Sequence, residues 1–300
     1  MRFDGRVVIV TGAGQGLGRA HALEFGRRGA RVIVNDLGGG LRGEGADASL
    51  AQRVADEIVE GGGEAAASSD SVEQGPRIVE AALDHFGRID VVINNAGILR
   101  DASFAKMTDE DWDLVYRVHL EGSYRVTRAA WPHMRKQQFG RVLMTTSAAG
   151  LYGNFGQANY AAAKLGLVGL AQTLAVEGRE RNIHVNAIAP TAGSRITATV
   201  FPEPLLDALK PELVTPLAVR LCHEDAQETG QVFEVGGGWV TRLRWQQSAG
   251  AFFDKGAPLT AESLNARWDE VQSFDHVLYP ERINDTFAVL GHKIGLHIAL

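Results

Sequence analysis

The sequence has very little cysteine, since Cys222 stands alone among 300 residues. A single thiol cannot form a disulfide within one chain, which is typical of proteins from a reducing compartment. No apolar run reaches the roughly 18 uncharged residues of a membrane span. No apolar signal region precedes the first strand-like run, and the chain does not end in a Ser-Lys-Leu type of peroxisomal signal. We therefore expect a cytoplasmic protein with no membrane partner.

Basic residues are not in excess either. The chain has 30 Lys and Arg against 36 Asp and Glu, which gives a formal net charge of -6. Because nucleic acids and anionic membranes bind basic surfaces, this balance argues against a nucleic-acid partner. A hydrophobic content of 45% in a chain of this length is enough to bury a full core. We expect no metal site.

Short apolar runs alternate with longer stretches of helical periodicity over the first 240 residues. Strands that are apolar on both faces and separated by helices imply a parallel sheet with helices on both sides. Right-handed crossovers then predict an α/β fold of the Rossmann type, with a doubly wound parallel sheet. The expected strands are 6–10, 31–35, 89–93, 141–145, 184–188 and 231–235, and the expected helices are 17–28, 76–86, 109–138 and 157–181.

Two stretches depart from this alternation. Residues 37–45 are rich in glycine and predict a flexible loop directly after the second strand. After Trp239 the alternation stops, and only scattered helical signals remain, such as residues 260–271. We therefore expect a nucleotide-binding domain over residues 1–240 and a C-terminal helical extension over residues 241–300.

A glycine-rich loop, residues 11–18, follows the first expected strand and opens the first expected helix. Its glycines let the main chain turn sharply and approach a pyrophosphate, and the helix N-terminus offers free N–H groups to the phosphates. A glycine loop alone can also be a plain turn, but the strand before it and the helix after it favour a dinucleotide site. The candidate cofactor residues in this loop are Gly12, Gly16, Leu17 and Gly18.

Asp36 comes at the end of the second expected strand. In this topology a carboxylate at that position accepts hydrogen bonds from the adenosine ribose hydroxyls. It would also repel a 2′-phosphate, so Asp36 favours NAD over NADP. The alternative is that Asp36 is only a turn residue.

Four motifs in order resemble the short-chain dehydrogenase/reductase family. They are the Thr-Gly-x-x-x-Gly-x-Gly loop at residues 11–18, Asn-Asn-Ala-Gly at 94–97, a serine at 147, and Tyr-x-x-x-Lys from Tyr160 to Lys164. The resemblance covers some 240 residues. It implies a cofactor site that includes Asp70 at the adenine, Asn95, Gly97, Tyr160 and Lys164, and a catalytic group of Ser147, Tyr160 and Lys164.

The chemistry of this trio explains its spacing. Tyr160 and Lys164 lie one helical turn apart, so both side chains project from one face of a helix. A free tyrosine has a pKa near 10, and a neighbouring ammonium and a positively charged nicotinamide would favour the phenolate. Tyr160 is then the expected base for the alcohol proton, Ser147 the residue that holds the substrate oxygen, and Lys164 a ligand of the nicotinamide ribose.

Two positions depart from the common pattern of the family. Many members carry an asparagine in the long fourth helix, where it supports a proton relay, and this chain has His119 there. His119 could hydrogen-bond in its place, leave the relay to a main-chain carbonyl, or only pack. Thr191 follows Pro190 where the family often has glycine.

Several stretches resemble one subgroup, the (3R)-hydroxyacyl-CoA dehydrogenase units of peroxisomal multifunctional enzymes, whose members also include 17β-hydroxysteroid dehydrogenases. These are residues 34–39, 95–101, 152–160 and 188–195. The subgroup also has histidine at the position of His119. The resemblance implies NAD-dependent oxidation of a (3R)-hydroxyacyl-CoA to the 3-ketoacyl-CoA. A chain of 300 residues has no room for further catalytic domains, so we expect a stand-alone homologue.

The substrate stays open at this point. The catalytic motifs fit a 17β-hydroxysteroid equally well, and a catalytically silent NAD-binding scaffold is the alternative of another class. Family members usually form homodimers or homotetramers, which the resemblance implies here too. Basic residues that could meet CoA phosphates, or could simply be solvated, are Arg195, Lys210, Arg242 and Arg244.

Overall fold

The computed structural model describes residues 1–193, 208–254 and 256–295. The chain divides into two compact units, Met1–Arg242 and Leu243–Leu300. We describe each unit by itself. The functional domains expected at residues 1–240 and 241–300 stay a prediction.

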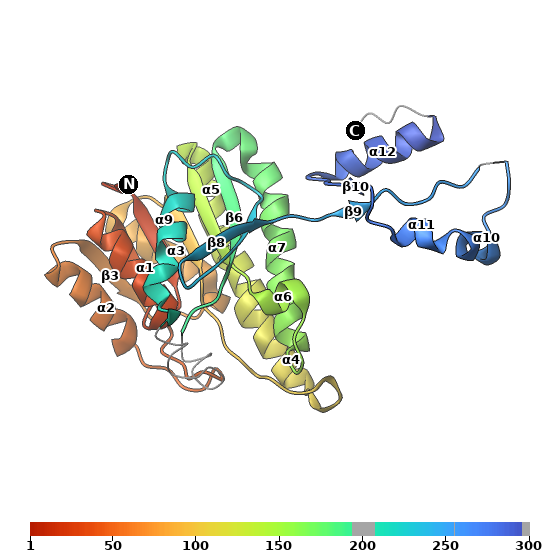
Figure 1. Ribbon diagram of the computed structural model, residues 1–300. Helices are drawn as coiled ribbons and strands as arrows, with labels where there is room; N and C mark the ends of the chain where they lie inside the picture. Colours follow the sequence, from red (N-terminus) through yellow and green to blue (C-terminus); the bar gives the residue numbers. More distant parts are fainter. Residues whose placement is uncertain (194–207, 255, 296–300) are drawn as a thin grey trace. The chain divides into compact units, whose positions relative to one another are not determined.

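An eight-stranded sheet forms the centre of the first unit (Figure 1). Its strand order is β3-β2-β1-β4-β5-β6-β7-β8, and neighbouring strands from β3 to β7 run parallel. The order reverses between β1 and β4, which is where doubly wound sheets bind ligands at the carboxyl ends of their strands. The strands are β1 (Val7–Thr11), β2 (Arg31–Asn35), β3 (Glu64–Ser68), β4 (Val91–Asn94), β5 (Gly140–Thr145), β6 (Ile183–Pro190), β7 (Val232–Gly236) and β8 (Trp239–Leu243).

Helices cover both faces of this sheet. α1 packs against α2 and α9, whereas α5 packs against α3 and α7, as doubly wound connections require. The helices are α1 (Gly16–Arg27), α2 (Ser49–Glu60), α3 (Gly75–Phe86), α4 (Asp109–Tyr116), α5 (Gly122–Gln137), α6 (Ala148–Tyr152), α7 (Ala158–Gly178) and α9 (Thr215–Cys222). Short helical turns are η1 (Val72–Gln74), η2 (Phe104–Lys106), η3 (Arg117–Glu121), η4 (Arg179–Arg181) and η5 (Pro211–Leu213).

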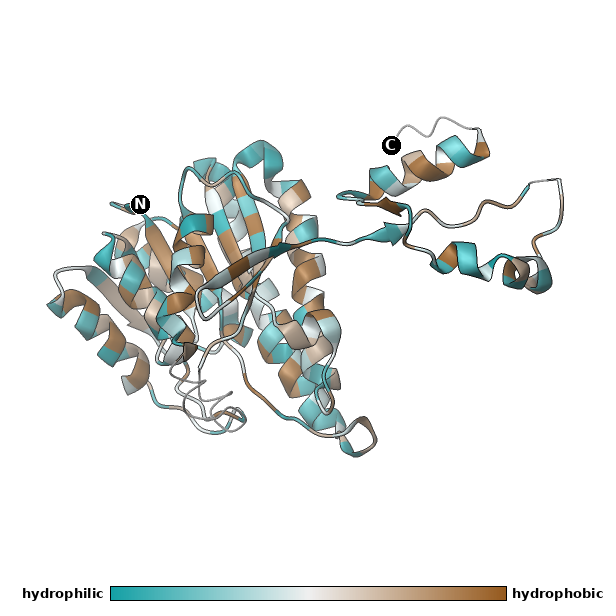
Figure 2. Cartoon of the chain, viewed as in Figure 1, coloured by the Kyte–Doolittle hydropathy of each residue, from teal (hydrophilic) through white to brown (hydrophobic). Residues whose placement is uncertain are grey.

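Apolar strands build the core. Every residue of β1, β4 and β5 is buried. Figure 2 shows hydrophobic colour along strands of the sheet, whereas the helices around it carry both hydrophobic and hydrophilic residues. Strands buried on both faces have no solvent-facing alternation, so their sequences read as continuous apolar runs. The predicted doubly wound Rossmann-type fold is confirmed.

β3 and α2 are among the elements that were not expected. β3 has the sequence Glu-Ala-Ala-Ala-Ser, without a β-branched residue, yet it pairs in parallel with β2 over its whole length. α2, which precedes it, buries Val54 and Ile58 on one face. Residues 37–45, expected as a flexible loop, are held by hydrogen bonds to residues 99 and 100.

The second unit is small, and most of its regular elements are helices. It contains α10 (Ala261–Ala266), α11 (Trp268–Gln272), α12 (Ile283–Ile294), and an antiparallel pair of short strands, β9 (Gln247–Ser248) and β10 (Val277–Leu278). Among its described residues only Gly291 is buried, while large apolar side chains such as Leu259 and Ile283 are more than half exposed. The unit therefore has no core of its own in the described part.

Candidate active site

Glycines of the β1–α1 loop allow a close approach that other residues would block. A Cβ on Gly18 would lie 2.1 Å from the carbonyl oxygen of Gly12, and a Cβ on Gly12 would lie 2.7 Å from the Cα of Ala96. Gly12 also has a φ of 65°, in the left-handed region that favours glycine. The missing side chains thus let α1 begin directly beside the ends of β1 and β4.

The N-terminus of α1 presents main-chain N–H groups without a side-chain cap. Gln15 precedes the helix in an extended conformation and makes no capping hydrogen bond. A Cβ on Gly16, which opens the helix, would meet no atom within 4 Å. The side chain of Leu17 packs on the apolar core. Free N–H groups and the positive end of a helix dipole fit a pyrophosphate.

Asp36 lies beside this loop, directly after β2. Its Oδ2 accepts a hydrogen bond from the Gly14 N–H at 2.7 Å, and its Oδ1 accepts one from the Gly38 N–H at 2.7 Å. The carboxylate is therefore fixed between the glycine loop and residue 38, where it could still accept further hydrogen bonds from a ribose.

Asn95 and Asp70 both make hydrogen bonds that connect neighbouring segments of the chain. The Asn95 amide donates to the main-chain oxygens of Thr11 and Gly12 at 3.0 and 3.1 Å, which ties the end of β4 to the glycine loop. The main-chain oxygen of Asp70 accepts from the buried Asn35 amide at 2.8 Å, and its side chain is 31% exposed. Asp70 can therefore offer its carboxylate to a ligand, whereas the Asn95 side-chain amide is already engaged.

Ser147 and Tyr160 come together after β5. Ser147 precedes α6, and its Oγ accepts a hydrogen bond from the Ala149 N–H at 3.2 Å. Tyr160 lies in the first turn of α7 and is half-buried. Burial raises the pKa of Tyr160, a hydrogen bond from Ser147 lowers it, and the nearby Asp101 raises it.

Lys164 lies one turn further along α7 and is buried. Its Nζ donates to the main-chain oxygen of Thr145 at 2.6 Å and lies 5.5 Å from the centre of the Tyr160 ring. Burial lowers the pKa of Lys164 to about 7.

The expectation that the ammonium of Lys164 and a positively charged nicotinamide together favour the phenolate stays a prediction. The net shift in the pKa of Tyr160 is upward, because burial of the phenol outweighs the hydrogen bond from Ser147. The same desolvation that lowers the pKa of Lys164 weakens its ability to hold a full positive charge there. A positively charged nicotinamide beside the phenol would lower the pKa of Tyr160 further.

His119 occupies η3, a π-helical turn between α4 and α5. The ring is buried, with its Nε2 2.8 Å from the carbonyl oxygen and 3.0 Å from the nitrogen of Ile98. It also meets the Tyr160 ring edge-to-face, with centroids 5.1 Å apart. Burial, together with the charge of Lys164, holds the pKa of His119 well below the ordinary range, so the ring is neutral.

Of the roles open to His119, packing and hydrogen bonding are both realised. The imidazole Nδ1 is buried without a hydrogen-bond partner among the described residues. The main-chain oxygen of His119 accepts a hydrogen bond from the Ser123 hydroxyl at 2.6 Å. A π-helical turn inside a helix frequently marks a functional site. Whether His119 supports a proton relay stays a prediction.

Sequence reasoning missed one polar residue of this site. Asn159 is 1% exposed, and its Oδ1 accepts a hydrogen bond from the Tyr160 N–H at 2.8 Å. Its amide donates to the main-chain oxygens of Arg100 and Asp111 at 3.1 and 3.2 Å. The available signal was a polar residue immediately before the tyrosine, but nothing in the spacing distinguishes it from a surface asparagine.

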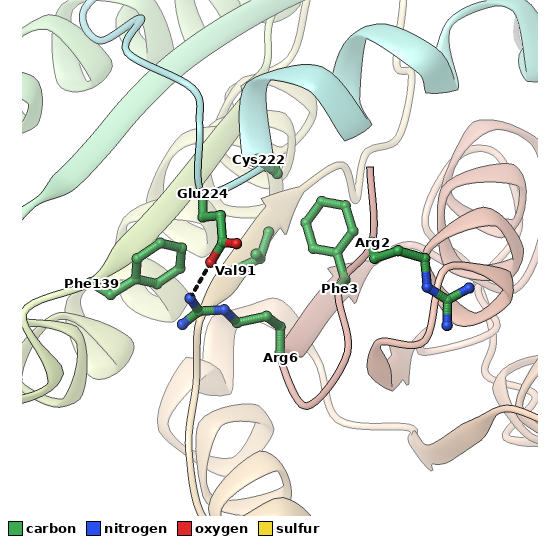
Figure 3. Close-up of a pocket in the computed structure, with 7 residues that line it drawn as sticks. All are labelled: Arg2, Phe3, Arg6, Val91, Phe139, Cys222 and Glu224. Atoms are coloured by element: carbon green, nitrogen blue, oxygen red, sulfur yellow. Dashed lines mark hydrogen bonds and ion pairs between the residues drawn. The ribbon is translucent and has the colours of Figure 1, made fainter.

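A small pocket lies at the other end of the strands and is unrelated to these groups (Figure 3). An ion pair between Arg6 and Glu224, 2.8 Å apart, crosses it. None of the candidate site residues lines it. The lining residues are Arg2, Phe3, Arg6, Val91, Phe139, Cys222 and Glu224.

Three of the four basic residues considered for CoA phosphates lie among the described residues. Arg195 lies outside the described residues. Lys210 precedes η5 in the first unit, and Arg242 belongs to β8. In the second unit the guanidinium of Arg244 stacks 3.7 Å from the centre of the Tyr279 ring.

Neither a metal centre nor a membrane span can be recognised in the part of the chain that the structure describes. No group of three His, Cys, Asp or Glu side chains there is arranged to hold a metal ion. Within the same residues, no helix combines the length and apolar character needed to cross a bilayer.

Comparison with known proteins places this chain in a family. The family model described as short chain dehydrogenase matches residues 6–200. A short-chain type dehydrogenase/reductase of Mycobacterium tuberculosis is 51% identical over 89% of this chain and 93% of its own length. This chain belongs to the short chain dehydrogenase family. The family and the Rossmann-type fold together imply a nicotinamide nucleotide cofactor.

Two further relatives of this short chain dehydrogenase are much longer proteins. Peroxisomal multifunctional enzyme type 2 of Mus musculus is 59% identical over 95% of this chain but only 39% of that enzyme. The structure of full-length peroxisomal multifunctional enzyme type 2 from Drosophila melanogaster matches with a TM-score of 0.85 and 40% identity. That match covers 98% of this chain and 50% of the Drosophila chain. The chain thus spans half or less of the length of these two relatives.

Proposed function

We propose that this short chain dehydrogenase oxidises a secondary alcohol to a ketone with NAD. The single observation that carries the proposal is the meeting of Ser147, Tyr160 and Lys164 after β5, where the Lys164 Nζ lies 5.5 Å from the centre of the Tyr160 ring and Ser147 is close enough to lower the pKa of Tyr160. These groups lie at the carboxyl end of the sheet, the end at which the β1–α1 loop lies. We propose a (3R)-hydroxyacyl-CoA as the substrate.

Each residue has a defined part in the proposed reaction. Ser147 accepts a hydrogen bond from the Ala149 N–H, and its single O–H, which is directed to Tyr160 in the free chain, turns to donate to the substrate oxygen in the proposed reaction. Tyr160, as the phenolate, takes the proton of the alcohol. Lys164 donates one N–H to Thr145 and has further N–H groups for the ribose of the cofactor. When bound, the oxidised nicotinamide supplies the hydride acceptor.

A substitution at Tyr160 gives the sharpest test. Tyr160→Phe removes the base and keeps the ring that packs on His119. We expect turnover to fall by about a thousandfold, within the range for the loss of a general base. The NAD dissociation constant should stay unchanged. Turnover is followed by NADH absorbance and binding by calorimetry. Activity that survives in Tyr160→Phe would refute the mechanism, and a wild-type chain that binds NAD without oxidising any alcohol would support the silent-scaffold alternative.

Asp36 supports NAD as the preferred cofactor. Its carboxylate is fixed by Gly14 and Gly38 next to the glycine loop, and a negative charge there repels a 2′-phosphate. We expect kcat/KM for NAD to exceed that for NADP by at least about a hundredfold. Asp36→Ser should lower kcat/KM for NAD and raise kcat/KM for NADP, so that the ratio falls. NADP used better than NAD by the wild-type chain would contradict this assignment.

The substrate class rests on resemblance to the multifunctional enzymes. A decisive comparison measures kcat/KM for medium-chain hydroxyacyl-CoA thioesters of both configurations and for a 17β-hydroxysteroid. We expect the (3R)-thioester to be used best. Robust steroid oxidation without thioester oxidation would replace the proposed substrate by its alternative.

Assembly and location are proposed on the same basis. We propose a homodimer or homotetramer, which light scattering after size-exclusion chromatography can distinguish from a monomer. The cytoplasmic location stays a prediction, and the two long relatives have names that place them in peroxisomes. Fractionation of the source cells tests it.

A further inference from the structure

We propose that Arg100 is a positioning residue that couples the adenosine end of the cofactor site to Tyr160. This inference rests on the proposed function, because it assigns the cofactor to the β1–α1 loop and Asp36. Arg100 lies in the segment between β4 and α4, and its side chain is only 13% exposed. It is the shared partner of three structural parts: the loop of residues 37–45, the start of α4, and the start of α7.

The first part is the loop that follows Asp36. Its Leu41 carbonyl accepts a hydrogen bond from the Leu99 N–H at 2.9 Å, and its Arg42 carbonyl accepts one from the Arg100 Nε at 2.9 Å. A Cβ on Gly43 would come within 3.3 Å of Ile98, so the loop also packs on this segment. Because Asp36 is hydrogen-bonded to the Gly38 N–H, a shift of the loop would move the carboxylate proposed to bind the ribose.

The second part is the start of α4. Nη1 of Arg100 donates to Asp111 at 3.1 Å and to Glu110 at 3.2 Å. These charge-assisted bonds are the strong kind, and the planar guanidinium can make them while its Nε still donates to the loop. Arg100 thus holds the loop and the helix in one arrangement.

The third part is the start of α7, where Tyr160 lies. The main-chain oxygen of Arg100 accepts from the Asn159 amide at 3.1 Å, and the same amide donates to the main-chain oxygen of Asp111 at 3.2 Å. The Asn159 Oδ1 in turn accepts from the Tyr160 N–H at 2.8 Å. A continuous set of hydrogen bonds therefore runs from the loop after Asp36 through Arg100 to the main chain of Tyr160.

Three variants separate this coupling from a simple loss of stability. Arg100→Met removes all the side-chain hydrogen bonds, whereas Arg100→Lys keeps a cation for the carboxylates and loses the planar group that also reaches Arg42. Arg27→Met is the matched control, because it breaks a surface ion pair with Glu24 whose arginine is 69% exposed. For each full-length chain we would measure the melting temperature, the NAD dissociation constant, kcat, and hydrogen exchange of residues 38–45.

We expect Arg100→Met to raise the NAD dissociation constant and to lower kcat, each by about tenfold, as for one lost charge-assisted hydrogen bond. Exchange at residues 38–45 should become faster. Arg100→Lys should restore most of the melting temperature but not the affinity for NAD. If Arg100 had a merely structural role, Arg100→Lys would restore both. Arg27→Met should leave all four measurements unchanged.

Two results would overturn the coupling. One is an Arg100→Met chain with a lower melting temperature but unchanged NAD affinity and kcat. The other is Arg100→Lys with both stability and NAD affinity restored, and this variant carries the test if Arg100→Met does not fold. A wild-type chain that neither binds NAD nor oxidises alcohols would instead refute the proposed function. In that case unchanged exchange at residues 38–45 in the variants would refute the coupling separately.

Discussion

Gly97→Ala should disturb the site through His119. Gly97 lies in the Asn-Asn-Ala-Gly motif after β4, with a φ outside the left-handed region, so alanine adds only its Cβ. That Cβ would lie 2.3 Å from Cε1, 3.0 Å from Nδ1 and 3.2 Å from Nε2 of His119. The imidazole cannot turn away freely, because it is buried, hydrogen-bonded to Ile98 and packed on Tyr160.

The size of the effect follows from these distances. An ordinary carbon contact is about 3.5–4.0 Å, so the ring or the main chain must move by about 1 Å. Overpacking of a buried site costs about 1–3 kcal/mol. For a unit of this size, that loss lowers the melting temperature by roughly 2–10 °C. Because the displaced ring touches Tyr160, kcat should fall by about ten- to a hundredfold, as expected for a catalytic group misplaced by about 1 Å.

A double-mutant cycle tests the cause. His119→Asn is smaller and still has a donor and an acceptor for Ile98, so it makes room for the new Cβ. The double variant should lose less stability and activity than the sum of the two single variants, with a coupling of about 1 kcal/mol or more. Gly169→Ala in α7 is the control, because a Cβ there meets no atom within 4 Å. Strictly additive losses, or a Gly97→Ala chain with unchanged kcat and melting temperature, would refute the reasoning.

Three further predictions follow from burial and hydrogen bonding. Lys164→Met should abolish activity yet raise the unfolding free energy below pH 7 by up to about 5 kcal/mol, because burial lowers the pKa of Lys164 from 10.5 to about 7. Between these two pKa values the folded wild type binds fewer protons than the unfolded chain, so its free energy of unfolding rises with pH. In urea unfolding, Lys164→Met should therefore exceed the wild type in stability by less at pH 9 than at pH 6. An equal or larger difference at pH 9 would contradict this. Ser147→Ala should shift the acidic limb of the kcat/KM profile for oxidation to higher pH, since Ser147 lowers the pKa of Tyr160, which must lose its proton to act as the base; an unchanged midpoint would show that Ser147 does not act on the phenol. A peptide of residues 243–300 should show little helical circular dichroism. Gly291 is the only buried residue among its described positions, and short helices are marginally stable alone. A cooperative helical unfolding transition would contradict this.

The parts of the fold that sequence predicts well are those with a strong local cause. β1 and β4 are continuous apolar runs, and the glycines between β1 and α1 have a steric reason that spacing alone reveals. β3 has no such cause, because Glu64 to Ser68 contains three alanines, which favour helix over strand. It becomes a strand because β2 offers it an open edge in the sheet, and that partner is a property of the fold.

The proposed catalytic trio could be named from the sequence because the motif of the family that it resembles fixes the spacing of Ser147, Tyr160 and Lys164. The residues that hold the trio in place could not. Asn159 and Arg100 act through main-chain atoms of residues some 50 positions away, and any residue can supply a main-chain oxygen. A pattern of residue types therefore carries no record of such bonds. The same reason explains why residues 37–45, read as a flexible loop from their glycine content, are in fact anchored.

The burial of Lys164 links the stability of the chain to its proposed activity. An amine in an apolar interior tends to lose its proton, and here a single main-chain oxygen, that of Thr145, receives its hydrogen bond. For stability and for packing around α7, an apolar side chain at this position would be better than an amine, because it costs less to bury. The lysine makes sense where a ligand brings hydroxyl groups that accept its remaining N–H groups. The cost of burying Lys164 in the free chain is then offset on binding, so the cofactor should raise the pKa of Lys164 while its positive ring lowers that of Tyr160. On addition of NAD, the pKa of Lys164 should rise and that of Tyr160 should fall, as measured by pH titration followed by NMR. Changes of both pKa values in the same direction would exclude this explanation.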